Sequence, residues 1–159
     1  MSRSLGSQLP APVLGLLDGR NLGEKTGFAM LLATVDQRGH PHCALLSVGE
    51  VLARSPGTLI LALYATSSTT GNLRRGGRLT LALASGGLAY YVKATATERH
   101  GPLSDLPGLA VFDVAVDEVL EDSEPIAQVT SGFTLTLAQD PAKIVAHWER
   151  GVAALAALP

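Results

Sequence analysis

A stretch of hydroxyl and basic side chains is the part of the sequence best suited to binding chemistry. Five Ser and Thr residues stand together and two arginines follow shortly after them, in the order Thr66-Ser67-Ser68-Thr69-Thr70-Gly71-Asn72-Leu73-Arg74-Arg75. Hydroxyl groups, free backbone N–H groups at a helix start and guanidinium groups are the donors that bind a phosphate monoester. The stretch therefore predicts an anion site at the beginning of a short helix.

A purely structural interpretation of this stretch stays open. A Ser or Thr before a helix commonly caps the helix N-terminus, and Arg74 and Arg75 would then form a solvated basic face. Neither a Walker Gly-Lys-Ser/Thr sequence nor a Rossmann glycine fingerprint accompanies the stretch, so nucleotide folds of those kinds are not supported. Lys93, on the polar side of a later predicted strand, is a second candidate for binding an anion, with a simple rim lysine as the alternative.

The histidines and the single cysteine indicate less. His40 and His42 are two residues apart and would share one face of a strand, where they could approach a metal or a haem, but no second ligand cluster accompanies them. We interpret them as surface or hairpin-end histidines. Cys43 is flanked by apolar residues, which predicts an inert core thiol. The sequence thus predicts no metal site and identifies no catalytic residue.

Composition limits the class of protein. The 159 residues are 47% hydrophobic and only 16% charged, which predicts one folded domain whose apolar surface is partly covered by a second subunit. Twelve Lys and Arg against 14 Asp and Glu give a net charge of −2, so there is no global basic field for nucleic acid or an anionic membrane. A lone cysteine and no convincing signal peptide predict a cytoplasmic protein.

A β-hairpin is the clearest local structure. Two apolar segments, residues 27–35 and 40–48, are joined by the polar connection Asp36-Gln37-Arg38-Gly39. The first segment is apolar on both faces, which predicts a strand that is central in a sheet or lies at an interface.

Apolar runs and alternation predict further strands and two helices. The strands are expected at residues 58–65, 78–84, 88–99, 111–121 and 131–137, with Phe112, Val114, Val116 and Leu120 inward and Val119 outward. The total of about six to seven strands favours a mainly β, antiparallel barrel over βαβ units. A short middle helix follows Thr66, and Asp140-Pro141 begins an amphipathic C-terminal helix that should pack on the barrel.

Three segments together resemble the pyridoxamine 5'-phosphate oxidase-like family of FMN-binding split barrels: GFAMLLATVDQRGHPHCALLSVGEV, TLILALYATSSTTGNLRRGGRLTLAL and LAYYVKATATE. The resemblance covers about residues 20 to 135. It implies one split-barrel domain over residues 1–159, with a barrel core at about 20–137 and a helix at about 141–157. Members of this family are typically homodimers that bind FMN in clefts between the subunits, while relatives use deazaflavin, haem or no known cofactor.

The family's binding residues carry over only in part. The phosphate-contacting serine matches Ser67, and an amide side chain before the helix leucine matches Asn72. The family's lysine falls at Thr69 and its strand arginine at Ala44, so two principal cations are missing. The residues expected to bind the cofactor are therefore the matched ones, their neighbours and the nearby cations: Ser67, Ser68, Thr69, Asn72, Arg74, Arg75 and Lys93.

Two functions are expected from this resemblance. The first is a flavin-dependent oxidoreductase in which FMN performs hydride or electron transfer, but which is not a true pyridoxamine phosphate oxidase. The second is a non-catalytic split-barrel binding protein or a cofactor-free dimer, which the missing cations favour. In both cases the partners are a second subunit and, at most, a small-molecule ligand.

Overall fold

The computed structural model describes residues 2–100 and 105–159 and is mainly β. Its strands are β1 (Ser2–Ser4), β2 (Met30–Val35), β3 (Pro41–Leu46), β4 (Val51–Ser55), β5 (Thr58–Tyr64), β6 (Arg78–Ser85), β7 (Leu88–Glu98) and β8 (Leu109–Asp122). Its helices are α1 (Ala11–Leu17), the 3-10 helix η1 (Leu22–Lys25), α2 (Ser68–Gly76) and α3 (Pro141–Ala157). None of the helices in the described ranges is both long and apolar enough to cross a membrane.

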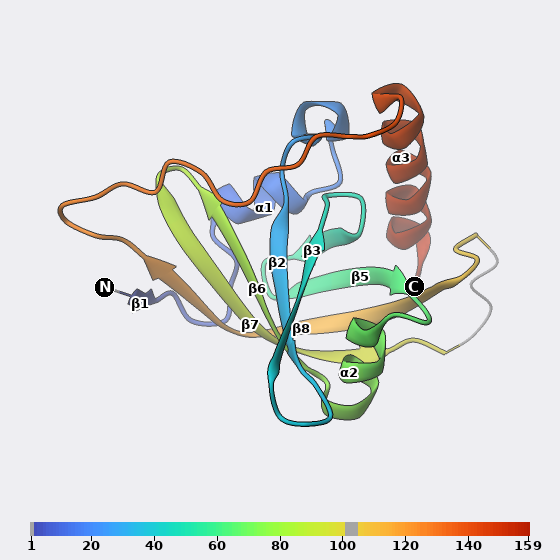
Figure 1. Ribbon diagram of the computed structural model, residues 1–159, viewed down its shortest axis with the longest axis horizontal. Helices are drawn as coiled ribbons and strands as arrows, with labels where there is room; N and C mark the ends of the chain where they lie inside the picture. The colour runs from blue at the N-terminus through green and yellow to red at the C-terminus, as the bar shows by residue number, and fades with distance from the viewer. Residues whose placement is uncertain (1, 101–104) are drawn as a thin grey trace.

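The strands form one antiparallel sheet that curls into a split barrel. Their order is β3-β2-β6-β7-β8-β5-β4, and β1 pairs with the end of β8. The two edge strands, β3 and β4, are joined by only four residues, 47–50, so the sheet must bend back on itself (Figure 1). This arrangement confirms the predicted antiparallel split barrel, with eight strands in place of six to seven.

The hairpin of β2 and β3 is confirmed. Its register runs from Met30 opposite Leu46 to Val35 opposite Pro41, and Gly39 in the turn has a φ of 82° that favours glycine. Inward residues of β2 are buried, whereas Val35 on the other face is 56% exposed. The strand therefore has one core face and one apolar face that ranges from half-buried at Leu31 and Ala33 to exposed at Val35.

The exposed face of this hairpin corrects one prediction. Cys43 is exposed on β3 and is not a core thiol. β3 is an edge strand, and Cys43 lies opposite Ala33, on the face turned away from the core. The apolar flanks of Cys43 in the sequence reflect a strand with apolar residues on both faces rather than burial.

A bulge in β8 corrects the predicted alternation. Lys93 pairs with Glu118 while its neighbour Ala94 pairs with Val116, so Asp117 is an extra residue on the β8 side. Beyond the bulge the faces exchange. Val119 is buried and Leu120 is half-buried, the reverse of the predicted arrangement.

Residues 131–137 do not form the predicted strand. The segment runs beside residues 27–29, where the Ala29 N–H donates to the Phe133 carbonyl and the Leu135 N–H to the Gly27 carbonyl, and it makes a single bridge between Phe28 and Thr134. The segment alternates apolar and polar side chains, as an extended chain does. It pairs with a neighbouring segment at one bridge only, so it does not form a strand.

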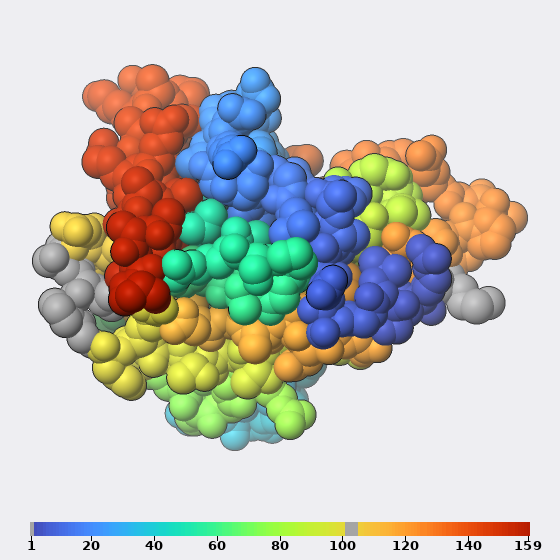
Figure 2. Space-filling view, turned by 180° about the vertical axis from the view of Figure 1, so that it is seen from behind, coloured from blue at the N-terminus to red at the C-terminus, as the bar shows by residue number. Residues whose placement is uncertain are grey.

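The two longer helices occupy different places on the barrel. The Asp140 side chain caps α3 by accepting from the Ala142 N–H at 3.0 Å, and α3 buries Trp148, Val152 and Leu155. This helix lies beside η1 and β4, as the view from behind shows (Figure 2). The shorter helix α2 contacts β2, β3, β5 and β7. It therefore packs against strands near both edges of the sheet, β3 and β2 at one edge and β5 near the other. The predicted middle and C-terminal helices are confirmed.

Candidate functional site

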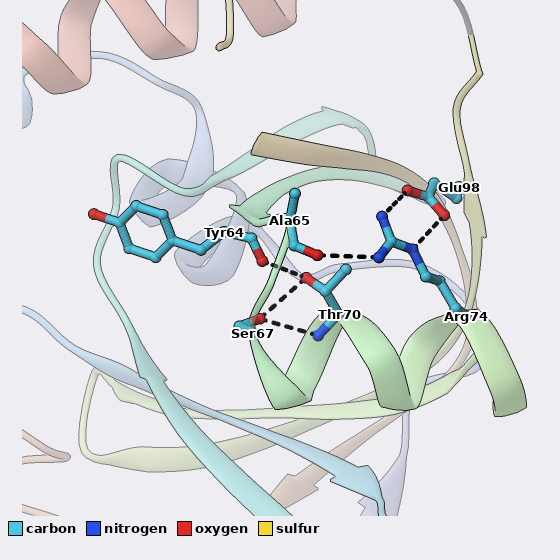
Figure 3. Close-up of polar contacts among 6 residues, drawn as sticks. All are labelled: Tyr64, Ala65, Ser67, Thr70, Arg74 and Glu98. Carbon is cyan, nitrogen blue, oxygen red and sulfur yellow. Dashed lines mark hydrogen bonds and ion pairs between the residues drawn. The ribbon is translucent and has the colours of Figure 1, made fainter. Parts of the chain in front are cut away.

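Hydroxyl groups after β5 begin helix α2. The Ser67 Oγ accepts from the Thr70 N–H at 3.1 Å, and the Thr70 Oγ1 donates to the Tyr64 carbonyl at 2.8 Å (Figure 3). These bonds are those of an N-cap, as the structural interpretation of the sequence predicted. Ser67 and Thr70 therefore use their hydroxyls to build the turn between β5 and α2.

The other hydroxyls of the stretch differ in exposure. Thr69 is buried, with 5% of its surface exposed, whereas Ser68 is exposed at the helix start. The N–H groups in the first turn of a helix have no partner within the helix, and the helix dipole makes that end positive. Ser68 is thus an exposed hydroxyl in the first turn of α2.

The two arginines of α2 have different partners. Arg74 donates from Nε and Nη2 to the two carboxylate oxygens of Glu98, at 2.8 and 2.7 Å, and from Nη1 to the Ala65 carbonyl at 3.0 Å (Figure 3). The bond from Arg74 lowers the pKa of Glu98, and that carboxylate raises the pKa of Arg74. Arg74 is therefore committed to a link between α2 and β7.

Arg75 turns the other way, toward the hairpin. Its Nη2 donates to the Asn72 Oδ1 at 2.5 Å, and its Nη1 lies 3.6 Å from the position that a Cβ on Gly71 would take. The guanidinium therefore lies back over α2, toward its first turn. No carboxylate in the described part of the chain forms an ion pair with Arg75.

A pocket of about 340 Å³ lies between α2 and the β2–β3 hairpin. Helix α2 contributes Ser68, Gly71, Asn72 and Arg75, and the hairpin contributes Asp36, Gln37, Arg38 and His42. We call it the α2–hairpin pocket. Two guanidinium groups and an imidazole surround it, so its chemistry suits an oxyanion.

One carboxylate, that of Asp36, also lines the pocket. It accepts from the backbone N–H groups of His40 at 2.9 Å and Arg38 at 2.8 Å, and the bond from His40 is the main cause of a lowered pKa for Asp36. Asp36 therefore shapes the hairpin turn while remaining charged, and it offsets part of the positive charge around the pocket.

Sequence reasoning missed the four hairpin residues of this pocket and Gly71; the basic ones among them are Arg38 and His42. Arg38 is exposed in the hairpin turn, and His42 is half-buried on β3 opposite Thr34. His42 was predicted to be an ordinary hairpin-end histidine, and the signal that could have singled it out was its shared hairpin with Arg38. Nothing in the sequence indicates that α2 packs against this hairpin. No group of three or more His, Cys, Asp or Glu side chains is placed to hold a metal within the described ranges.

Lys93 lies on another face of the sheet. It forms an ion pair with Glu118 at 2.8 Å and lines a broader cleft of about 610 Å³, which also contains Asp117 and Arg78. Two carboxylates in that cleft make it less suited to an anion than the α2–hairpin pocket. The structure thus brings Ser68, Asn72 and Arg75 together and leaves Arg74 and Lys93 outside.

The two positions at which the resemblance expects cations hold Ala44 and Thr69 here. Ala44 is half-buried on β3, on the same face as His42, and Thr69 is buried under α2. Among the described residues that line the α2–hairpin pocket, the basic side chains are Arg38, His42 and Arg75.

Comparison with known proteins gives a sequence relative and several structural ones. The chain is 33% identical over 139 residues to YclD, an uncharacterised protein of Bacillus subtilis, a match that covers 85% of this chain and 87% of that protein. No family model matches the chain.

Solved structures share the fold. A protein of Lactobacillus delbrueckii, provisionally described as a pyridoxamine 5'-phosphate oxidase, is 23% identical, with a TM-score of 0.57 over 74% of this chain and 98% of that one. A protein named F420 reductase is 11% identical, with a TM-score of 0.51 over 70% of this chain and 98% of that one. At these identities the likeness shows the split-barrel fold.

Proposed function

We propose that this chain, which belongs to the family of YclD and has the pyridoxamine 5'-phosphate oxidase-like split-barrel fold, is an FMN-binding oxidoreductase that acts as a homodimer. The observation that carries the proposal is the α2–hairpin pocket, in which Arg38, His42 and Arg75 converge beside the first turn of α2. When bound, FMN supplies hydride or electron transfer, and the protein supplies orientation and electrostatics.

The pocket fits the phosphate end of FMN. A phosphate monoester carries a charge of about −1.5 to −2 at pH 7 and three acceptor oxygens. Arg38 and Arg75 form no ion pair with a carboxylate of the described residues, so both keep N–H groups for such a ligand. Ser68 adds a hydroxyl donor. A charge-assisted contact contributes about 1.5 to 3 kcal/mol, which is enough for two arginines to select a phosphorylated ligand.

We expect a second copy of the chain to complete the flavin site. A pocket of about 340 Å³ is at the small end of the roughly 300 to 1,000 Å³ typical of small-molecule sites. The apolar face of β2 and β3, with Val35 56% and Leu45 52% exposed, is free in a single copy. A second copy on this face would cover these side chains and add walls to the cofactor site.

The absorption spectrum and mass of the purified protein test this proposal. A bound flavin gives a yellow protein with a band near about 450 nm, and added FMN loses fluorescence on binding. Light scattering should give about twice the chain mass of 16.5 kDa. A colourless protein that does not quench FMN removes the flavin, and a mass near 16.5 kDa at micromolar concentration removes the dimer.

A non-catalytic binding protein with the same fold is the second candidate function. The specific observation in its favour is that Ala44 and Thr69 stand where the resemblance expects two cations, and that Thr69 is buried. A protein of this kind would bind another small anion in the α2–hairpin pocket and would leave FMN fluorescence unchanged. A titration with FMN therefore separates the two candidates.

A further inference from the structure

A buried amide links strand β2 to the guanidinium of Arg75. The Asn72 Nδ2 donates to the Thr34 Oγ1 at 3.0 Å, and the Asn72 Oδ1 accepts from the Arg75 Nη2. Asn72 is 5% exposed and Thr34 is 3% exposed, so the first bond is shielded from water. These three residues form a continuous chain of hydrogen bonds from the core to the mouth of the α2–hairpin pocket.

The orientation of the Asn72 amide is fixed by its partners. If the amide were turned over, its NH2 group would face the Arg75 Nη2, and two donors would meet with no acceptor between them. The Thr34 hydroxyl, which accepts from Asn72, has its own proton directed toward the His42 carbonyl at 3.4 Å. The Asn72 Oδ1 therefore faces Arg75, and the Asn72 Nδ2 faces Thr34 in the core.

The link limits where the Arg75 guanidinium can lie. One N–H group is held by Asn72, and the side chain passes over Gly71 toward the start of α2. A guanidinium has five N–H donors, so the others remain for a ligand. A long side chain that is fixed before binding loses less conformational entropy when the ligand arrives.

We propose that Asn72 and Thr34 are positioning residues that hold Arg75 as the phosphate-binding side chain of this pocket, so that the site selects FMN over riboflavin. The proposal rests on the function proposed above and assigns its phosphate contact to a residue that the family's pattern does not supply. Neither positioning residue needs to touch the ligand. Their effect on binding passes through Arg75.

The experiment compares FMN and riboflavin, which differ only in the phosphate, by fluorescence titration of the full chain. Arg75→Ala should weaken FMN about 10- to 100-fold and leave riboflavin unchanged. Asn72→Ala and Thr34→Val should weaken FMN about 3- to 10-fold, again without an effect on riboflavin. Arg150→Ala is the matched control, because Arg150 is exposed on α3, does not line the α2–hairpin pocket and forms no ion pair with the described residues, and it should change neither affinity more than about twofold.

A double variant separates positioning from a general structural role. If Asn72 acts through Arg75, then Asn72→Ala combined with Arg75→Ala binds FMN no more weakly than Arg75→Ala alone. Additive losses, or equal losses for FMN and riboflavin, would overturn the proposal. Circular dichroism of each variant checks folding, and Thr34→Val gives a near-isosteric alternative if Asn72→Ala does not fold.

Failure of the proposed function would be recognised separately. If the wild type binds neither flavin, stabilisation by inorganic phosphate in a thermal unfolding assay becomes the readout for the same variants. A wild type that phosphate stabilises, with the effect reduced in Asn72→Ala and lost in Arg75→Ala, keeps the positioning role and removes FMN. A wild type that phosphate does not stabilise, or variants that behave like the wild type, would remove the positioning role.

Discussion

Arg74 and Glu98 join α2 to β7 through a two-pronged ion pair, with distances of 2.8 Å from Nε to Oε2 and 2.7 Å from Nη2 to Oε1. The residues are 24 positions apart in the chain, so the pair restrains the helix against the barrel. The carboxylate accepts both bonds in a geometry that suits guanidinium, and its pKa is lowered mainly by the bond from Arg74.

The first prediction concerns the pH dependence of this pair. A carboxylate with a lowered pKa in the folded state stabilises the protein above the pKa of the unfolded state, about 4.3, and that contribution is lost as the pH falls through the folded value. Glu98→Gln should therefore lower Tm at pH 7, and the deficit should shrink as the pH is lowered below about 5. Thermal unfolding from pH 7 to pH 3 measures it.

The control for this prediction is Glu149→Gln, which changes an exposed glutamate on α3 that forms no ion pair with the described residues. It should give the same Tm as the wild type at every pH. A deficit in Glu98→Gln that stays constant down to pH 3 would show that the loss is due to packing and not to the charge on Glu98.

The second prediction uses two glycines of the same helix. Gly71 lies inside α2, where an added Cβ would meet only the Arg75 Nη1, at an ordinary contact distance of 3.6 Å. Gly71→Ala should raise the free energy of unfolding by about 0.5 to 1 kcal/mol, because alanine has a higher helix propensity and the unfolded chain loses less freedom. Denaturant unfolding measures this gain.

Gly77 provides the contrast. It ends α2 with a φ of 64°, its N–H donates to the Leu73 carbonyl at 2.8 Å, and a Cβ there would lie 3.1 Å from the Ala96 carbonyl oxygen. Gly77→Ala should lower the free energy of unfolding by about 1 kcal/mol or more. If both alanine variants change stability in the same direction, the assignment of the helix end is wrong.

The third prediction concerns Glu50, in the turn between β3 and β4. Its carboxylate accepts from the Ser47 N–H at 2.5 Å and from the Ser47 hydroxyl at 2.8 Å, yet burial outweighs these bonds and raises the pKa of Glu50. An acid with a raised folded pKa binds its proton more readily in the folded state, so the contribution of Glu50 to stability becomes more favourable as the pH falls toward the range in which unfolded carboxyls titrate.

Substitution of Glu50 should remove this dependence. Glu50→Gln keeps an acceptor for the Ser47 N–H and has no charge to bury, so its stability relative to the wild type should be greatest at pH 7 to 8 and least near about pH 4. Ser47→Ala should have the opposite effect on the slope, because the lost hydroxyl bond lets the pKa of Glu50 rise further. Urea unfolding at each pH measures the free energy of unfolding. If this free energy depends on pH in the same way in the wild type and in Glu50→Gln, the prediction is contradicted.

Much of the fold could be predicted because its strands are apolar over most of their length. The β2–β3 hairpin, β5, β6 and β7 each carry a continuous or alternating apolar pattern between polar turns. Two strands escaped prediction. β1 is Ser2-Arg3-Ser4 and has no apolar side chain, so only its backbone pairing with β8 defines it. β4 buries just Val51 and Leu52 before it becomes polar, which is too short an apolar pattern to predict a strand.

Of the candidate site, only the start of helix α2 could be predicted from the sequence. Hydroxyl residues before a helix predicted the N-cap at Ser67, a local interaction within four residues. The separation of Arg74 from Arg75 depends on Glu98 and Asn72, and the choice between these partners follows from the packing of α2 against β7 and β2. Adjacent arginines look alike in a sequence, and their roles differ because the helix directs them about 100° apart.

The last prediction is that this chain is not a working pyridoxamine 5'-phosphate oxidase, even if it binds FMN. Such an enzyme holds two phosphorylated molecules at once, the flavin and the substrate, and so needs several cations for two phosphate groups. The α2–hairpin pocket has Arg38, His42 and Arg75 for one phosphate, with Asp36 opposing them. The C-terminal helix adds no Arg or His after Arg150, and its buried Val152 and Leu155 face the barrel.

A missing substrate-phosphate contact would lower the rate as well as the affinity, because remote phosphate binding positions the reacting carbon over the flavin. The protein loaded with FMN, supplied with pyridoxamine 5'-phosphate and oxygen, should therefore form the pyridoxal product far more slowly than an ordinary enzyme rate of about 1 s⁻¹. Product absorbance follows the reaction, and an authentic pyridoxamine 5'-phosphate oxidase in the same assay is the control. Turnover at about 1 s⁻¹ or faster would mean that a second phosphate site exists, and the broad cleft beside Lys93 and Arg78 would be the first place to look for it.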